Sequence, residues 1–395
     1  MAYELRLSRQ AGRRWALLMQ DGEAVEISLL NSASKAAGEA EVGDYFAARV
    51  RRKVPSLGAA FVEIAPQLEA YLEASDLPGD GSPAERLTQL VDGALIAVQV
   101  RRGAVGGKRA RVSAKLEFSG RQLAYRPEGD RRRISRRIVD EQERQRLDGW
   151  LGRVAAGGVV LRTAAGGASD AELDAELQRL IRNSEELAAE LRGCSAPAQL
   201  GRPADRLGRL LDSLATRPLR RVVVESRDEA DEIAPRLTAD CDLVVHEGAS
   251  DLYTASHMDD HLRCATRRRL HLPSGGSIVI ERTEALIAID VNTAAIRSVG
   301  DAERTLVAVN LEAAKEIARQ IRLRDLCGTI VIDFIDMKAS QDRDAVAEAL
   351  REGMEEDRRT HRVAGWTPLG LCEISRRREG ATWSEQLALE KGGAA

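Results

Sequence analysis

Residues 285–337 contain two apolar runs, Ala285-Leu-Ile-Ala-Ile289 and Thr329-Ile-Val-Ile332, and an aspartate follows each run, Asp290 and Asp333. Apolar runs of this length predict buried strands. The sequence between them predicts an amphipathic helix, whose apolar positions recur three and four residues apart: Leu306, Val309, Ala313, Ile317 and Ile321. A right-handed strand–helix–strand crossover makes the strands parallel, so both carboxylates leave the sheet at the same edge.

Two carboxylates at one edge of a sheet are a common way to hold Mg²⁺ for phosphate chemistry. The second carboxylate has two candidates, Asp333 and Asp336, which lie three residues apart. On an extended chain they point to opposite faces, and the spacing does not choose between them. None of the five histidines has a spacing that suggests a catalytic base.

Length and composition predict a water-soluble protein of two or three compact units, since the chain has 395 residues and 44% of them are hydrophobic. No apolar run approaches the roughly 20 residues that span a bilayer. The first ten residues are charged and lack the apolar core of a signal peptide, so we expect a cytoplasmic location.

The charges are unevenly distributed, although the formal net charge is only −3. Arginine is concentrated at residues 101–111, 121–137 and 267–269, and such local clusters are what a polyanion would meet. The excess of arginine over lysine suits phosphate binding, and a base-composition bias explains it equally well. The five cysteines contain no Cys-x-x-Cys pair, which indicates reduced thiols and no zinc signature.

The first 33 residues alternate as strands do, and Asp21-Gly22 predicts a hairpin turn. A hairpin of this size needs a larger sheet, for which the β-rich run 220–224 is a candidate partner. The segment 159–163 predicts another strand, which ends on Arg162-Thr163 and offers an arginine and a hydroxyl to an anion. Residues 169–192 predict a helix without chemical features.

Residues 43–112 contain several short strands separated by turns, which indicates a small closed barrel of the OB type. Such barrels bind single-stranded nucleic acid on one face. Phe61 and Tyr71 are candidate stacking platforms, and the alternative for Phe61 is a place in the barrel core. Candidate phosphate contacts are Arg49, Arg51, Arg52, Lys53 and Lys108.

Seven ordered runs over residues 272–378 together resemble the ribonuclease E/G family of bacterial endoribonucleases. They are Leu272-Pro-Ser-Gly-Gly276, Ile280-Glu-Arg-Thr-Glu-Ala-Leu286, Ile289-Asp-Val-Asn292, Asn310-Leu-Glu-Ala-Ala314, Arg322-Leu-Arg-Asp-Leu326, Ile330-Val-Ile-Asp-Phe-Ile-Asp-Met337 and Leu369-Gly-Leu-Cys-Glu-Ile-Ser-Arg376. Upstream, residues 43–65 resemble the S1-type domain of the family. Ile134-Ser-Arg-Arg-Ile138 and Leu161-Arg-Thr163 resemble its 5′-end sensor.

The resemblance implies a multidomain α/β fold, in which an RNase H-like domain is split by inserted S1-type and sensor regions and is followed by a DNase I-like catalytic domain. The implied parts are residues 1–36 (RNase H-like, first part), 37–115 (S1-type OB domain), 116–204 (5′-sensor region), 205–269 (RNase H-like, second part) and 270–395 (DNase I-like). The likeness is weak between residues 164 and 265.

The resemblance also implies roles for individual residues. The metal-binding aspartates of the family fall on Asp290 and Asp333, and its accompanying catalytic asparagine falls on Asn292. This match selects Asp333 over Asp336. The RNA contacts fall on Phe61, Tyr71 and Lys108. The pocket for a 5′-monophosphate falls on Gly120, Ala124, Arg162 and Thr163.

Together with these residues, the resemblance implies a Mg²⁺-dependent endoribonuclease that hydrolyses single-stranded, A/U-rich RNA in RNA processing or mRNA decay and leaves, as the family does, 5′-phosphate and 3′-hydroxyl ends. The alternative is a non-catalytic RNA-binding protein of the same family. The paired carboxylates favour the enzyme, because without a metal they would repel the phosphates of RNA. A metal phosphodiesterase acting on a small substrate is disfavoured by the barrel and the arginine-rich stretches.

The chain departs from the family pattern at two places that matter for regulation and assembly. Thr360 falls where many members have a sensor arginine, and Arg358, Arg359 and Arg362 are candidate substitutes. No Cys-Pro-x-Cys motif follows Arg378, so we expect no zinc link. A homo-oligomer therefore has no basis in the sequence, and neither has a scaffolding role that depends on the carboxyl-terminal parts of the family.

Overall fold

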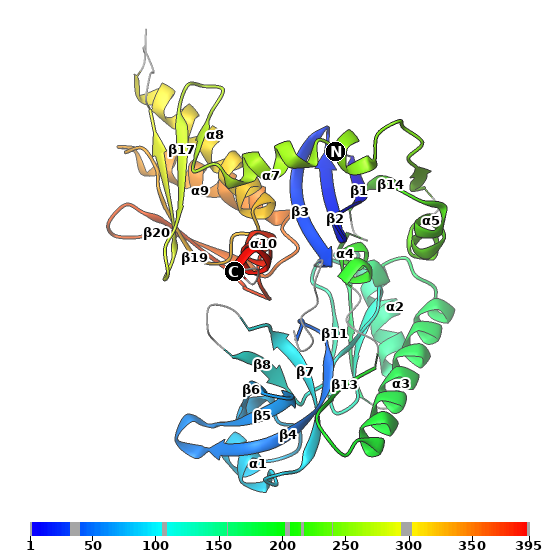
Figure 1. Ribbon diagram of the computed structural model, residues 1–395. Helices are drawn as coiled ribbons and strands as arrows, with labels where there is room; N and C mark the ends of the chain where they lie inside the picture. The colour runs from blue at the N-terminus through cyan, green and yellow to red at the C-terminus, as the bar shows by residue number, and fades with distance from the viewer. Residues whose placement is uncertain are drawn as a thin grey trace. The chain divides into compact units, whose positions relative to one another are not determined.

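The computed structural model describes residues 2–31, 40–104, 109–155, 157–201, 206–214, 217–238, 240–293 and 302–392. The chain divides into two compact units of mixed α/β structure (Figure 1). The first unit comprises Met1–Ser34, Pro218–Arg378 and Thr382–Ala395, and the second comprises Lys35–Arg217 and Glu379–Ala381. Each unit is described separately below.

The amino-terminal strands belong to a five-stranded sheet of the first unit, with the order β15-β14-β1-β2-β3. Its strands are β1 (Tyr3–Gln10), β2 (Arg13–Gln20), β3 (Glu23–Asn31), β14 (Leu219–Val224) and β15 (Asp242–Val245). The sequence predicted one turn here, and the structure has a second at Ala11-Gly12. Both turns have positive φ at their two central residues, which suits the right-handed twist of the hairpins. Strand β1 pairs in parallel with β14, which gives the amino-terminal strands the sheet that they need.

Helix α5 (Arg227–Ile233) joins β14 to β15 within this sheet. Helices α6 (Leu252–Ala255) and α7 (Met258–Thr266) then lead from β15 to the next sheet of the first unit. Helix α7 ends at Thr266, three residues before the strand that begins at Arg269.

A six-stranded sheet completes the first unit, with the order β16-β17-β18-β19-β21-β20. Its strands are β16 (Arg269–His271), β17 (Ser277–Arg282), β18 (Ile287–Asn292), β19 (Gly328–Asp333), β20 (His361–Trp366) and β21 (Cys372–Arg376). Strands β18 and β19 are parallel neighbours joined through α8 (Ala302–Leu323), as the apolar runs predicted.

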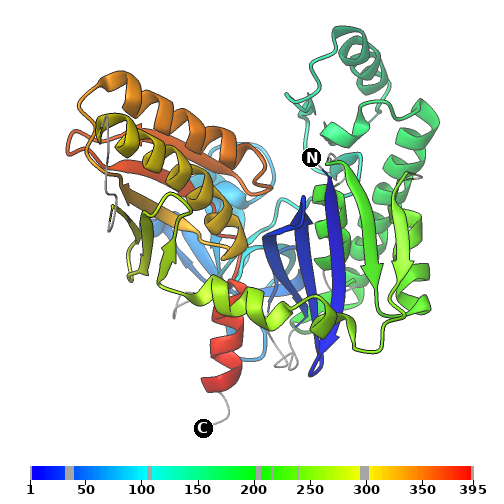
Figure 2. The same ribbon diagram turned by 90° about the horizontal axis from the view of Figure 1, so that it is seen from above.

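Helices α8 and α9 (Ser340–Glu355) lie side by side over one face of this sheet (Figures 1 and 2). The apolar positions Val309, Ala313, Ile317 and Ile321 of α8 are fully buried, as their spacing predicted. A Cβ on Gly353 would lie only 2.7 Å from the Cβ of Ala318, so glycine allows the two helices to approach closely. The face that these helices do not cover carries apolar and polar side chains, among them Val279 and Asp290, which are paired between β17 and β18.

The carboxyl-terminal helix α10 (Trp383–Gly392) packs against the first unit. Trp383 is buried beside residues of β2 and β3, and its indole N–H donates to the carbonyl of Leu323 at 3.2 Å.

The second unit contains a closed five-stranded barrel, consistent with the predicted OB-type domain. Its strands are β4 (Tyr45–Val54), β5 (Ala59–Ala65), β6 (Leu68–Glu73), β7 (Leu95–Arg102) and β8 (Ala110–Ser113). They pair in the order β4-β5-β6-β8-β7, and β7 returns to pair with β4. Helix α1 (Pro83–Gln89) lies between β6 and β7 in the chain, and β13 (Ala198–Leu200) adds a strand beside β4.

A second, four-stranded sheet in this unit has the order β11-β12-β10-β9. It is formed by β9 (Phe118–Ser119), β10 (Leu123–Arg126), β11 (Arg132–Ile134) and β12 (Gly158–Leu161). Helices α2 (Glu141–Gly152) and α3 (Asp170–Gly193) share its apolar core, and α4 (Arg206–Leu214) lies later in the chain. The predicted strand at 159–163 therefore ends before Arg162 and Thr163.

Candidate active site and nucleic-acid-binding surfaces

Asp290 and Asp333 lie directly opposite each other on neighbouring strands. They form the last parallel pair of the β18–β19 ladder, and strands in such a ladder are about 4.8 Å apart. Along β18, Ile287, Ile289 and Val291 are buried, whereas Asp290 between them is exposed. The alternation of a strand therefore puts both aspartates on the face that is not covered by α8 and α9.

Asn292 lies two residues after Asp290 in β18, and so on the same face of the sheet. Its side-chain Nδ2 donates to Oδ2 of Asp290 at 2.5 Å. This hydrogen bond orients the carboxylate and leaves the other oxygen of Asp290 available.

The charge of Asp333 is poorly compensated. Its pKa is raised by burial, and then by the like charges of Asp290 and Asp336. Asp336 is exposed and lies beyond the end of β19, in the segment that leads to α9, whereas Asp333 is paired with Asp290. A bound cation would relieve the repulsion between these carboxylates.

The donor atoms of this site are those that a hard divalent cation prefers. Among the described residues, no group of three or more histidine, cysteine, aspartate or glutamate side chains is placed to hold a metal ion. Mg²⁺ is nevertheless commonly bound through only one or two carboxylates and keeps several waters. Two carboxylates with an adjacent amide, all oxygen donors toward solvent, therefore fit Mg²⁺ and do not fit a structural zinc site.

Phe61 and Tyr71 face each other on neighbouring barrel strands. They are paired in the β5–β6 ladder, and their ring centroids are 5.8 Å apart in an edge-to-face arrangement. Both side chains are half-buried, and the buried core of the barrel does not include Phe61, which argues against the core interpretation. Lys108, the third expected RNA contact, lies outside the described residues.

The basic residues around the barrel divide into two groups. Two arginines cover the ring of Phe61, with the Cζ atoms of Arg52 and Arg109 at 5.2 Å and 5.1 Å from its centroid. Three other expected phosphate contacts are engaged within the protein: Arg49 binds backbone carbonyls, Arg51 pairs with Glu63, and Lys53 donates to the carbonyl of Leu90. Arg52 is thus the best-placed of the four described cations for an RNA contact beside Phe61.

The four residues expected at the 5′-phosphate pocket lie in or beside two adjacent strands. Gly120 lies between β9 and β10, Ala124 lies within β10, and Arg162 and Thr163 directly follow β12. Ala124 pairs with Val160 of β12, two residues before Arg162. The backbone N–H of Arg162 donates to the carbonyl of Gln122 at 2.8 Å. The sheet therefore brings the two halves of the expected pocket together.

Thr163 has a hydroxyl partner from a third segment. The Oγ1 of Thr163 and the Oγ of Ser135 are 2.9 Å apart, and Ser135 lies within the arginine-rich run 121–137. Arg136 and Arg137, which follow it, are exposed. Two hydroxyls, those of Ser135 and Thr163, therefore lie together, and Thr163 directly follows Arg162 in the chain.

Comparison with known proteins agrees with these features. Residues 117–379 match the sequence model of the ribonuclease E/G family. The chain belongs to this family. It is 33% identical to ribonuclease G of Haemophilus influenzae over 363 residues, covering 85% of the chain and 72% of that protein. It is 32% identical to ribonuclease E of Nostoc sp., covering 87% of the chain and 52% of the relative, and 32% identical to ribonuclease G of Escherichia coli K12, covering 85% and 73%.

Glu176 of α3 is a residue of this ribonuclease E/G chain that sequence reasoning missed. Its carboxylate accepts hydrogen bonds from three consecutive backbone N–H groups, those of Arg121 (2.8 Å), Gln122 (2.7 Å) and Leu123 (3.0 Å). Gly120 is required beside it, because a Cβ there would lie 2.5 Å from the carboxylate carbon. The sequence showed only one glutamate among many on an acidic helix, so it carried no signal for this contact.

The three candidate substitutes for the family's sensor arginine differ in their contacts with other residues. Arg358 donates to Glu26, and Arg359 pairs with Asp325 at 2.7 Å. Arg362 is exposed on β20, as Thr360 is just before it. Arg362 is therefore the substitute that the contacts within the first unit leave most accessible.

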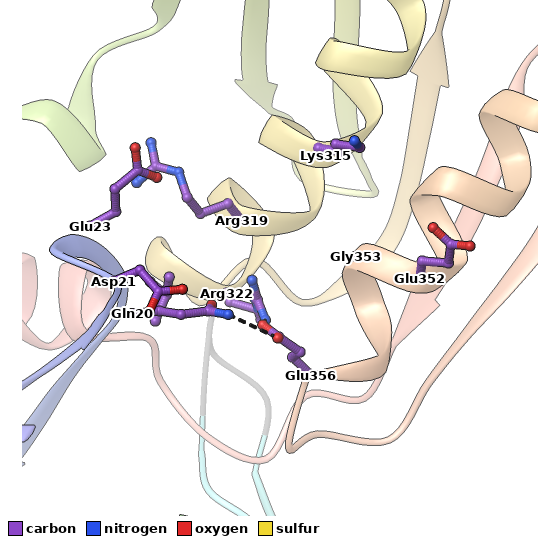
Figure 3. Close-up of a pocket in the computed structure, with 10 residues that line it drawn as sticks. Gln20, Asp21, Glu23, Lys315, Arg319, Arg322, Glu352, Gly353 and Glu356 are labelled. Carbon is purple, nitrogen blue, oxygen red and sulfur yellow. Dashed lines mark hydrogen bonds and ion pairs between the residues drawn. The ribbon is translucent and has the colours of Figure 1, made fainter. Parts of the chain in front are cut away.

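A pocket of about 450 Å³ lies in the first unit where the β2–β3 turn meets α8 and α9 (Figure 3). Its lining is almost entirely charged, and the charges on facing elements already pair. Glu356 accepts from Arg322 at 2.6 Å and from Gln20 at 3.0 Å. The pocket contains none of the expected catalytic residues, and its contacts join the five-stranded sheet to the two helices.

Among the described residues, no helix has the length and apolar character that crossing a membrane would require.

Proposed function

We propose that this chain is a Mg²⁺-dependent endoribonuclease that hydrolyses single-stranded, A/U-rich RNA and leaves 5′-phosphate and 3′-hydroxyl ends. The observation that carries the proposal is the pairing of Asp290 with Asp333 on the open face of the sheet, with Asn292 bonded to Asp290. The relatives named ribonuclease G and ribonuclease E support an RNA substrate.

Asp290 and Asp333 would hold the Mg²⁺ ion. The ion supplies an electrophile for the non-bridging phosphate oxygens and lowers the pKa of a bound water. Asn292 keeps the carboxylate of Asp290 in one orientation through its amide. No step requires a protein nucleophile, because the attacking water makes the new bond to phosphorus and the 3′-oxygen leaves with the electron pair of the broken bond.

The second unit would hold the RNA. Phe61 and Tyr71 offer aromatic surfaces to unpaired bases, and Arg52 offers a charge to the backbone. We assign Arg162 and Thr163, together with Ser135, to a terminal 5′-phosphate, since a guanidinium group and hydroxyls are suited to it. Lys108 belongs to the same proposal on the resemblance alone.

The domain layout is also a proposal: an RNase H-like domain split by the S1-type and sensor regions, then a DNase I-like domain from residue 270. The parallel pairing of Tyr3 with Leu219 supports the split, because it joins segments that the barrel separates in the chain. The β18–α8–β19 crossover supports the placement of the metal site in the last domain.

The metal site is tested by Asp290→Asn and Asp333→Asn, assayed on a short fluorescent single-stranded RNA with and without Mg²⁺. Both variants should lose Mg²⁺-dependent cleavage, because an amide cannot supply the anionic ligand, and should still bind RNA in EDTA. Asp344→Asn, which changes an exposed carboxylate on α9, is the control and should cleave normally. Full cleavage by both site variants would refute the assignment. Binding without cleavage by the unaltered protein would support the non-catalytic alternative.

The sensor is tested separately with one oligonucleotide carrying a 5′-hydroxyl, 5′-monophosphate or 5′-triphosphate end. Faster cleavage of the monophosphate that is lost in Arg162→Gln would support the pocket. Equal rates for all three ends in the unaltered protein would refute a working sensor and leave the metal-site proposal intact.

A further inference from the structure

Asn310 is a fully buried amide on the apolar side of α8. It has no solvent exposure, and it lies beside Val309 and Ala313, which are also fully buried. Its Nδ2 donates to the carbonyl of Ile335 at 2.8 Å, and its Oδ1 accepts from the N–H of the same residue at 3.1 Å. One side chain therefore satisfies both backbone polar groups of Ile335.

Ile335 lies beyond the last residues of β19 that pair with a neighbouring strand. The ladder of β19 with β18 ends at Asp333, and its ladder with β21 ends at Ile332. Two residues farther on, the amide of Asn310 supplies the donor and the acceptor that a neighbouring strand would supply. Ile335 lies between the two carboxylates, two residues after Asp333 and directly before Asp336, so this contact holds the backbone that carries both of them.

The residue type is specific to this contact. An apolar side chain would fit the surroundings but would leave the N–H and carbonyl of Ile335 without these partners, which is costly in a buried site. An aspartate could accept from the N–H but would face the carbonyl with a second oxygen and no proton. Asparagine provides one donor and one acceptor in the required arrangement.

The carboxylates need such a support. Asp333 lies opposite Asp290, and like charges at this separation repel unless a cation intervenes. Ile335, two residues beyond the end of β19, has no strand partner on either side, so repulsion could displace the segment after Asp333 in the absence of metal. A rigid attachment to α8 keeps the ligands near the geometry that the ion requires.

We propose that Asn310 is a positioning residue of the metal site, which holds the segment after β19 so that Asp333 stays opposite Asp290 before the cation binds. This inference rests on the proposed function of the aspartate pair. It adds a residue that touches neither metal nor RNA and acts through the backbone of Ile335.

The test compares Asn310→Ala with Gln320→Ala, which removes another buried amide from the same helix. The side chain of Gln320 is 2% exposed, donates to Glu316 at 2.9 Å and accepts from Arg324 at 2.5 Å. Like Asn310→Ala, Gln320→Ala therefore removes one donor and one acceptor. Both variants should melt at a lower temperature than the unaltered protein. A positioning role predicts that metal affinity falls in Asn310→Ala and not in Gln320→Ala, whereas general destabilisation predicts no such difference.

The measurements are calorimetric titration with Mn²⁺ alone, the rise in melting temperature that Mn²⁺ produces, and RNA binding in EDTA. We expect Asn310→Ala to weaken Mn²⁺ binding about tenfold or more, as loss of a supporting contact commonly does. Gln320→Ala should stay within about twofold of the unaltered protein, and RNA binding in EDTA should persist in both. If Asn310→Ala does not fold, Asn310→Ser, which keeps a polar group, is measured in its place.

Two outcomes separate the inference from the proposal beneath it. If Asn310→Ala or its serine counterpart binds Mn²⁺ as the unaltered protein does, or if Gln320→Ala loses affinity equally, the positioning role is overturned. If Asp290→Asn also binds Mn²⁺ normally, the failure belongs to the metal site itself.

Discussion

Removing the ring of Phe61 should weaken RNA binding without unfolding the barrel. Stacking of a base on an aromatic ring contributes about 1–3 kcal/mol by alanine substitution. In this protein the guanidinium groups of Arg52 and Arg109 lie 5.2 Å and 5.1 Å from the ring centroid. Exposed cation–π contacts are worth about 0.5–1 kcal/mol, and a base that stacks here must displace at least one of them. We therefore expect the lower part of the range for Phe61→Ala, about 1–2 kcal/mol, or about 5- to 30-fold in Kd.

The assay is fluorescence anisotropy of a labelled single-stranded RNA in EDTA, which prevents cleavage, with thermal melting as a check on folding. Val91→Ala, which shortens an exposed apolar side chain in the same unit, is the matched control and should leave Kd unchanged. An unchanged Kd in a stably folded Phe61→Ala variant would refute the stacking role. A large loss of melting temperature would instead show that the half-buried ring supports the barrel.

Three other predictions concern contacts of single side chains. Glu176→Gln removes the charge that orients the backbone N–H groups of residues 121–123, so the preference for a 5′-monophosphate over a 5′-hydroxyl end should fall by about tenfold, whereas Glu186→Gln on the same helix should not change it. Arg376→Leu leaves Asp325 and Asp357 without their shared partner, and the free energy of unfolding in urea should fall by about 3–5 kcal/mol. Burial alone would raise the pKa of Asp357, but hydrogen bonds from Arg376 hold this pKa below its usual value. The stability that Asp357 contributes is therefore complete above the pKa of an unfolded aspartate and is lost as the pH falls through the lower folded pKa. The acid unfolding of Asp357→Asn should lack this pH dependence.

Each of these predictions has an outcome that contradicts it. An unchanged end preference in Glu176→Gln, in a protein that has such a preference, would show that the loop does not need the carboxylate. A loss below about 1 kcal/mol in Arg376→Leu would mean that the buried aspartates find other partners or take up protons. A stability curve of Asp357→Asn that parallels the unaltered protein in acid would assign the pH dependence to other carboxylates.

Much of the site was visible in the sequence because burial imposes a period on the chain. The runs before Asp290 and Asp333 had the composition of buried strands, and the helix between them had its apolar residues at the right spacing. These patterns are local, since they arise from one face of each element meeting a core. They predicted the crossover, and with it the pair of carboxylates at one edge.

Other features could not be predicted from local sequence. A lone amide on an apolar helical face, such as Asn310, indicates a buried polar contact, but it does not indicate the partner. Glu176 was hidden among the acidic residues of its helix. The engagement of Arg49, Arg51 and Lys53 within the barrel could not be read from their charge, because an arginine beside a strand binds either RNA or a neighbouring carbonyl.

The sequence by itself determined the order of strands and helices, the membership of the ribonuclease E/G family and the residue types at the candidate metal site. For the amino-terminal strands the sequence offered a candidate partner at residues 220–224, and the structure supplied the parallel register of β1 with β14. Tertiary structure alone decided that Asn310 contacts Ile335 and that Glu176 accepts hydrogen bonds from the backbone of residues 121–123. The reason is physical: periodicity records whether a residue is buried, and it does not record which distant group it meets. That partner depends on strand register and helix packing, which many weak contacts set together.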